Sequence, residues 1–285
     1  MHEDINFLRL LYSSDEQNIL LALEIARAIP SLQAALAPFL AIHQHVHQQS
    51  TSIDTIEPNH ILSLNQSEIY WEYTQLKTLP SEILDLPHLE ELGLQGNLFS
   101  EIPSLILQSM PYLKYLCFTD NQLTSVSPDI QHLSQLQKLI LSDNQISELP
   151  GEIGHLKHLD YLSVDNNQLT QLPEEISQLT NLECLIANRN AIAALPRSIG
   201  KLKNLKYLYL DGNQLTKLPE EIGQLTNLEQ LSLQDNALLA HSIPQSIEQL
   251  PHLHTIYFCG NPNDYLDIYL PNCSIHYGWN DNPHP

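Results

Sequence analysis

The chain of 285 residues carries 12 basic and 33 acidic side chains, a formal net charge of −21, although only 16% of its residues are charged. This acidic excess argues against binding to duplex nucleic acid and against docking on an anionic membrane surface, because both depend on clusters of lysine and arginine. The hydrophobic fraction of 42% is typical of a folded chain, and no apolar run approaches the ~18 residues of a transmembrane helix.

The first 50 residues predict two or three helices. Residues 14–17, Ser-Asp-Glu-Gln, resemble a capping box, and apolar side chains follow at helical spacing. These apolar residues are Ile19, Leu20, Leu23, Ile25 and Ala26. Pro30 is expected to end this helix, and Ser31 to begin another that extends to about Gln48. We predict that residues 1–59 are a helical cap packed on the following coil; an independent effector module is the alternative.

Acidic residues precede the first apolar run, and no cleavable small-residue site follows it. This is the wrong order for a secretory signal, so a cytoplasmic location is expected.

A unit of 23 residues recurs between about residue 60 and residue 263. Asparagine holds the same phase in eight units, with steps of 24, 23, 23, 23, 23, 23 and 25 residues. These residues are Asn97, Asn121, Asn144, Asn167, Asn190, Asn213, Asn236 and Asn261. Each ends a segment such as LKNLKYLYLDGN (202–213), which reads LxxLxxLxLxxN, and QLTKLPEEIG (214–223) or a close variant follows.

One unit predicts a strand followed by a short helical turn. Leu208 and Leu210 alternate with Tyr207 and Tyr209, the period of two expected for a strand with one buried face. Residues 219–222, Pro-Glu-Glu-Ile, predict a turn with proline at its first helical position. Stacked units can bury leucines that one unit cannot, and the asparagine amide can bond backbone groups of adjacent turns. The sequence therefore predicts an α/β solenoid with a parallel sheet of about nine strands.

These units resemble the leucine-rich-repeat family, in the 23-residue type with an LPxxIxxL signature found in intracellular Ras-group proteins and in many bacterial ones. The resemblance covers about residues 60–263 and implies a right-handed horseshoe whose concave face is the parallel sheet. Some bacterial relatives attach a ubiquitin-ligase or GTPase domain. Barely two dozen residues follow the last repeat here, so we do not expect an enzyme.

Departures from the repeat predict local irregularities. Thr74 takes the asparagine position of the first unit, which predicts a partial, capping repeat. The second unit has one extra residue around residues 108–110, and two residues are inserted at Ala240 and His241. We interpret the insertions as drift of the repeat on loops, where they cost little, and a contact site is the alternative.

Residues 264–285 are predicted to cap the last repeat, and a ligand site is the alternative. The aromatic and apolar residues expected to form this cap are Tyr265, Leu266, Ile268, Tyr269, Tyr277 and Trp279. The cysteines lie far apart, in no CxxC pair, which predicts free thiols in a reducing compartment. They are Cys117, Cys184, Cys259 and Cys273. A bond between Cys259 and Cys273, as in the sealed caps of secreted relatives, is the alternative.

Candidate residues for catalysis or metal binding are few. His43, His45 and His47 form the tightest cluster, and on a helix His43 and His47 share one face, as in zinc-binding pairs. No HExxH pattern is present, so a solvated helix end is favoured over a metal site. GxSxG, P-loop and GxGxxG motifs are also absent from the sequence. We predict no catalytic residue, no metal and no cofactor.

The candidate binding site is the outward face of the strands. Four columns of side chains flank the buried leucines, and they contain five tyrosines and two isoleucines on a face expected to contact water. Exposed aromatic and apolar side chains on a rigid surface are typical interface anchors. The predicted binding residues are Tyr115, Tyr161, Ile186, Tyr207, Tyr209, Tyr257, Asp165 and Asp211. The alternative interpretation is that the tyrosines only cover the sheet.

The distribution of charge also favours this face as the binding site. Between residues 71 and 261 the four columns, with Glu72, carry seven acidic and two basic residues. The other residues of this span include fifteen acidic and eight basic ones. We predict a non-catalytic module that binds a protein or peptide of basic or mixed charge, steered by the acidic field, and neither nucleic acid nor membrane. The runner-up function is recognition of a small ligand, a saccharide stacked on the tyrosines.

Overall fold

The computed structural model describes residues 2–48, 51–86, 88–262 and 273–277. The chain divides into two compact units, residues 1–99 and residues 100–285. In the described residues, no helix is long and apolar enough to cross a membrane.

The first unit combines helices with two parallel strands. Its elements in chain order are α1 (His2–Leu11), α2 (Glu16–Ala28), η1 (Pro30–Leu36), α3 (Ala37–His47), α4 (Pro58–Leu64), β1 (Glu68–Tyr70), η2 (Ser81–Asp85) and β2 (Glu91–Gly93), where η marks a 3-10 helix. Asp15, not Ser14, caps α2, because the Asp15 side chain accepts the N–H of Gln17 at 2.9 Å. Leu20 is 44% exposed, so its predicted place in the buried stripe is wrong, and Ala22 lies in that stripe instead.

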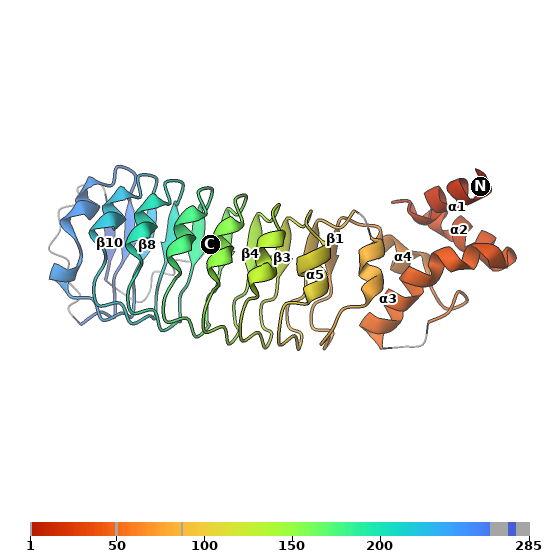
Figure 1. Ribbon diagram of the computed structural model, residues 1–285, viewed down its shortest axis with the longest axis horizontal. Coiled ribbons are helices and arrows are strands. Elements are labelled where there is room, and N and C mark those ends of the chain that lie inside the picture. Colours follow the sequence, from red (N-terminus) through yellow and green to blue (C-terminus); the bar gives the residue numbers. More distant parts are fainter. Residues whose placement is uncertain (1, 49–50, 87, 263–272, 278–285) are drawn as a thin grey trace. The chain divides into compact units, whose positions relative to one another are not determined.

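The second unit is a stack of coils with a parallel sheet of eight strands in chain order. The strands are β3 (Tyr115–Cys117), β4 (Lys138–Ile140), β5 (Tyr161–Ser163), β6 (Cys184–Ile186), β7 (Tyr207–Tyr209), β8 (Gln230–Ser232), β9 (Thr255–Tyr257) and β10 (Ser274–His276). The returning segments are α5 (Ser104–Ser109), η3 (Pro128–His132), η4 (Gly151–His155), η5 (Glu174–Gln178), η6 (Arg197–Lys201), η7 (Glu220–Gln224), η8 (Ala240–Ser242) and η9 (Gln245–Gln249). Strands and returning segments lie on opposite sides of the coils (Figure 1).

Strand β10 was not predicted. It pairs in parallel with β9 through Ile275 and Ile256, after the last repeat. Tyr265, Leu266, Ile268, Tyr269 and Trp279, predicted to form the carboxyl cap, lie outside the described residues. Cys117, Cys184, Cys259 and Cys273 are free thiols, so the alternative bond between Cys259 and Cys273 is not formed.

The asparagines join successive coils as predicted. Asn144 Oδ1 accepts the N–H of Leu123 at 2.9 Å, and its Nδ2 donates to the carbonyl of Phe118 at 2.8 Å. The same contact to the preceding coil recurs in the second unit at Asn167, Asn190, Asn213, Asn236 and Asn261. In the first unit, Asn97 Oδ1 accepts the N–H and the hydroxyl of Thr74 at 3.2 and 3.0 Å.

The returning turns differ in detail from the prediction. Pro219 precedes η7 with extended dihedrals (φ −72°, ψ 149°) rather than occupying its first helical position, and the turn is a 3-10 helix. The unit with one extra residue forms the six-residue α-helix α5 instead. The insertion at Ala240 and His241 forms the added 3-10 turn η8.

Candidate binding face

All eight predicted binding residues lie on one side of the second unit. We call this side the sheet face: the outward side chains of β3–β9 and of the three residues after each strand. Tyr161 and Tyr207 flank Cys184 in adjacent strands, and Ile186 pairs in register with Tyr209. Two strands away, Tyr257 pairs with Ser232, which itself pairs with Tyr209. The sequence therefore predicted this clustering, with Tyr115 two strands from Tyr161 at the other end.

The tyrosines are not equally accessible. Tyr161, Tyr207 and Tyr257 are half-buried, whereas Tyr209 is only 2% exposed. Burial, with the neighbouring groups of Cys184 and Tyr207, raises the pKa of Tyr209. The expectation that this whole face contacts water is therefore wrong at Tyr209, whose ring fills space between its neighbours instead.

Several contacts hold the accessible rings in place. The Tyr207 hydroxyl donates to Glu229 Oε2 at 3.1 Å. The Tyr257 ring stacks on His276 of β10 with centroids 4.8 Å apart and an interplanar angle of 22°. Burial raises the pKa of the Cys184 thiol to about 12, so this cysteine is a neutral packing group rather than a nucleophile.

The predicted binding residue Asp211 already has structural partners. Its Oδ1 accepts the Ser232 hydroxyl at 2.6 Å and the N–H of Gln234 at 2.8 Å. Its own N–H donates to Asn188 Oδ1 at 2.8 Å. Asn188 is 1% exposed, and its Nδ2 has no hydrogen-bond partner among the described residues. This network fixes the polar surface around Asp211. Asp165, which is half-buried, takes the same position two coils before Asp211.

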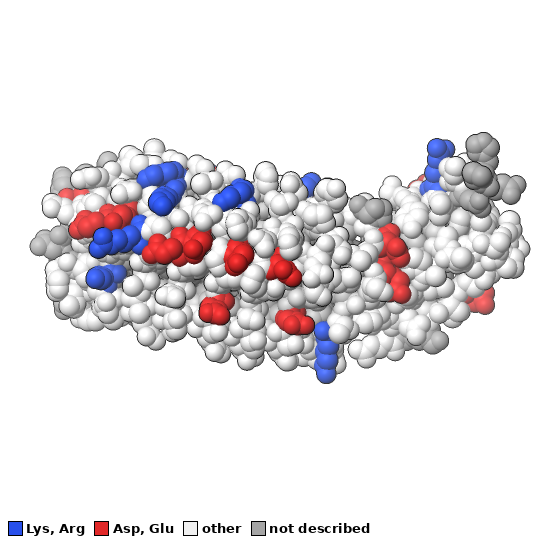
Figure 2. Space-filling model, in the orientation of Figure 1, with Lys and Arg blue, Asp and Glu red and all other residues white. Residues whose placement is uncertain are grey.

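Acidic residues at the end of this face serve the turn as well as the surface charge. Asp120, Asp143 and Asp235 are exposed and have left-handed φ values of 54°, 56° and 51°, a conformation that aspartate, asparagine and glycine adopt most readily. The opposite side of the unit carries both signs of charge: acidic and basic side chains lie beside one another over the 3-10 helices (Figure 2).

Two exposed tyrosines in the first unit were missed. Tyr70 is 47% and Tyr73 63% exposed, and they stand 23 residues before Gly93 and Gly96 in the columns of the repeat. The predicted binding residues all lie in later repeats, from Tyr115 on. The signal was present, because the repeat phase continues back to Thr74.

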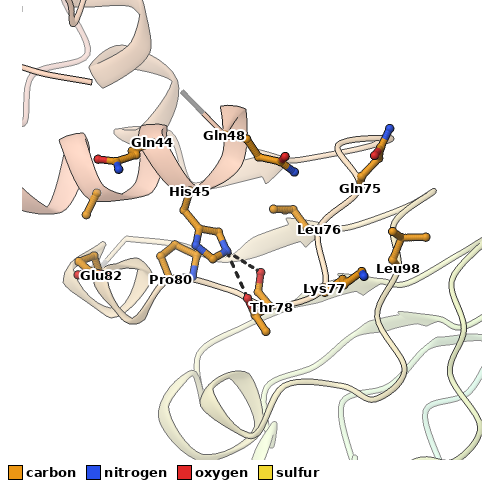
Figure 3. Close-up of a pocket in the computed structure, with 11 residues that line it drawn as sticks. Gln44, His45, Gln48, Gln75, Leu76, Lys77, Thr78, Pro80, Glu82 and Leu98 are labelled. Carbon is orange, nitrogen blue, oxygen red and sulfur yellow. Dashed lines mark hydrogen bonds between the residues drawn. The ribbon is translucent and has the colours of Figure 1, made fainter. Parts of the chain in front are cut away.

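The first unit also contains a pocket between α3 and the segment after β1, of about 830 Å³ (Figure 3). His45 Nε2 forms a hydrogen bond of 2.9 Å with the Thr78 carbonyl oxygen beside it. Other polar lining side chains are Gln44, Gln48, Gln75, Lys77 and Glu82. Amides and one charge of each sign suit hydrated polar groups rather than a buried apolar ligand.

The histidines that cluster in the structure differ from the predicted set. The His43 ring lies 4.4 Å from the His47 ring and 4.2 Å from the His60 ring of α4, whereas His45 turns to Thr78. Burial, followed by the charges of His60 and His47, lowers the pKa of His43. Among the described residues, no group of three His, Cys, Asp or Glu side chains is arranged to hold a metal ion.

Parallel strands, asparagine ladder and returning turns define a leucine-rich-repeat solenoid, and comparisons with known families agree. A model described as a leucine-rich repeat region matches residues 107–206, and a leucine-rich repeat model matches residues 180–238 and 203–262. The chain belongs to the leucine-rich-repeat family. Domains of this family are in general interaction modules for proteins. No curated protein sequence matches the chain.

Several solved structures are similar. A leucine-rich-repeat protein of Leptospira interrogans is 36% identical, with a TM-score of 0.58, over 71% of this chain and 58% of its own. The ectodomain of the Arabidopsis thaliana receptor kinase GASSHO1/SCHENGEN3, in complex with Casparian strip integrity factor 2, is 30% identical (TM-score 0.60; 70% and 25% of the chains). The plant peptide hormone receptor RGFR1, in complex with RGF2, is 28% identical (TM-score 0.52; 65% and 34%). This chain thus spans less than two thirds of each of these proteins.

Proposed function

We propose that this chain is a non-catalytic interaction module that binds a protein or peptide on the sheet face of the second unit. The observation that carries the proposal is the group of half-buried Tyr161, Ile186, Tyr207 and Tyr257 on strands β5, β6, β7 and β9 of one rigid sheet. Anchored aromatic side chains lose little conformational entropy on binding, so they are effective contact residues.

The related structures support a peptide or protein as the ligand class. Two of them are plant receptors in complex with partners, Casparian strip integrity factor 2 and RGF2. The exposed Asp120, Asp143 and Asp235 at the border of the sheet face favour a partner of basic or mixed charge. The overall charge of −21 disfavours nucleic acid and anionic membranes, and a cytoplasmic location belongs to the same proposal.

The test uses a double variant that removes accessible rings but leaves the buried Tyr209. Tyr161→Ala with Tyr207→Ala, the wild-type chain and a control variant are immobilised and exposed to a lysate of the source cells. The control is Tyr112→Ala, because Tyr112 is 75% exposed and lies before β3, outside the sheet face. Quantitative mass spectrometry then compares the proteins retained.

We expect at least one protein that the wild type and the control retain and that the folded double variant retains at least about tenfold less, since truncation of a hot-spot residue costs about 2 kcal/mol or more. The same proteins retained by all three chains would contradict binding at the sheet face. A glycan array tests the saccharide alternative, and saccharide binding lost in the double variant would replace the proposal.

A further inference from the structure

Tyr70 and Tyr73 form an exposed aromatic pair in the first unit. The Tyr70 ring lies against Gly93 in the paired strand β2, and the Tyr73 ring lies against Gly96 just after it. A Cβ atom built on either glycine would collide with the ring beside it. The two glycines therefore provide the space in which the rings lie across the next coil.

Both rings are held at their hydroxyl ends. The Tyr70 hydroxyl donates to Glu91 Oε2 at 2.6 Å, and Gln95 Nε2 donates to the Tyr73 hydroxyl at 2.7 Å. Tyr73 also has a left-handed backbone, φ 55°, which an aromatic residue adopts at a cost. Fixed rings that still expose about half of their surface are preorganised for a ligand that stacks on them.

Three carboxylates surround the pair. Glu68 and Glu72 are exposed, and Glu68 stands in register opposite Glu91, an arrangement in which like charges repel. The hydrogen bond to Glu91, together with burial and the charges of Glu91, Glu68 and Glu72, raises the pKa of Tyr70 to about 12. The Tyr70 phenol therefore stays neutral at physiological pH.

Neither β1 nor β2, the two strands of the first unit, contains a lysine or an arginine. Residues 1–99 contain thirteen acidic and three basic residues. Arg9 belongs to α1 and Arg27 to α2, where its guanidinium donates to the Ile53 carbonyl, and Lys77 lines the pocket beside α3. A cation that neutralises the carboxylates on β1 and β2 would relieve their mutual repulsion.

We propose that Tyr70 and Tyr73, with Glu68, Glu72 and Glu91, bind an arginine side chain of a peptide or protein partner. A guanidinium stacks on aromatic faces and donates paired hydrogen bonds to carboxylates, whereas an ammonium does only the second as a point charge. A neutral saccharide also stacks on tyrosine but gains no charge attraction from three carboxylates. The site rests on the proposed function, since it assumes a protein or peptide partner, and adds the chemistry of one contact.

The probe is the amidated peptide Gly-Arg-Arg-Gly, with Gly-Glu-Glu-Gly and maltotriose as comparisons, titrated into the full chain by calorimetry. We expect the arginine peptide to bind most tightly, and Tyr70→Ala with Tyr73→Ala to weaken it roughly tenfold, because cation–π contacts at exposed sites contribute about 0.5–1 kcal/mol each. Glu68→Gln with Glu72→Gln keeps the rings and should also weaken it. Tyr112→Ala is the matched control and should not.

Equal affinity of the wild type and the folded double alanine variant would overturn the site, as would a preference for Gly-Glu-Glu-Gly or maltotriose. If the double alanine variant does not fold, the pair Glu68→Gln and Glu72→Gln decides: unchanged affinity there also overturns it. If the peptide titration contradicts the arginine site but a partner is still captured through Tyr161 and Tyr207, only the arginine site is overturned. If the wild type and the Tyr161→Ala, Tyr207→Ala variant capture the same proteins, the proposed function is overturned instead.

Discussion

Each asparagine of the ladder satisfies backbone groups that two coils leave open at the inner bend. Asn144 accepts one N–H from the preceding coil and donates to three carbonyl oxygens, those of Phe118, Leu141 and Ser142. It is 9% exposed, so water cannot replace these bonds easily. A single amide thus decides whether several buried backbone groups are paired.

Asn144→Ala should therefore lower the free energy of unfolding by about 2–4 kcal/mol, because it leaves buried N–H and C=O groups without partners. Urea denaturation followed by circular dichroism measures the change. The matched control is Asn181→Ala: Asn181 is exposed and donates one bond, to the Lys157 carbonyl, so its loss should cost less than about 1 kcal/mol. Equal costs at the two positions would show that the ladder bonds contribute little.

The sequence predicts the direction of a side chain better than its accessibility. The period of two places Tyr209 outward on β7, yet it is buried, because exposure depends on the side chains of the strands on both sides. The converse holds at Tyr70, which stays exposed while its ring lies against a strand that carries Gly93 at the register position. Accessibility therefore depends on which residues the register places beside a side chain in the neighbouring coils. The period of two within one strand does not specify these neighbours.

At the scale of the element, the repeat predicts what recurs and misses what occurs once. Strands β2 to β9 fall where the recurring LxL segment places them. Helix α4 (Pro58–Leu64) was not predicted, although His60 and Glu57 form a capping box there. Strand β10 follows the last repeat, so the periodicity of the repeats could not predict it. An element that occurs once gives no periodic signal, so it can be predicted only from its local residues.

The packing of α3 on α4 predicts a pH dependence. Because the folded-state pKa of His43 lies below its ordinary 6.5, the unfolded chain binds more protons near and below that pH, and the first unit should lose stability as the pH falls through it. Stability from this contact is fully present above about pH 6.5. The groups that face His43 are His47 and Thr51 beside it and His60 on α4, which all lack a negative charge that could offset protonation.

Tryptophan fluorescence can follow this unit. In a Trp279→Phe background, Trp71 is the remaining tryptophan of the two, and it lies in residues 1–99. Urea midpoints at about pH 7.5 and pH 5.5 should differ more for this chain than for the same chain with His43→Gln, which removes the titrating ring. A midpoint that shifts equally in both chains would assign the acid sensitivity to other groups.

At the scale of the whole molecule, the charge of −21 acts at longer range than any single contact. The Debye length is about 10 Å at 0.1 M salt, so neighbouring carboxylates add their fields at the surface, and about 3 Å at 1 M, where they no longer do. On the 3-10 side of the second unit, bases lie among the acids and partly cancel them, as in Figure 2. On its sheet face, Lys138 and Arg189 are the bases of the four columns. We therefore expect a cation to be attracted toward the sheet face.

Association with a cationic peptide should therefore be fast at low salt and slow at high salt. We expect the association rate constant of hexa-arginine, measured by stopped-flow fluorescence, to fall more than about tenfold between 0.02 M and 1 M salt. The variant Tyr70→Ala with Tyr73→Ala should keep this salt dependence, because steering arises from the total charge, while its dissociation becomes faster. A DNA duplex or a vesicle rich in phosphatidylserine should not bind at 0.02 M salt, where an attractive field would be strongest. Binding of either, or a hexa-arginine rate indifferent to salt, would mean that local contacts rather than the net charge select the partner.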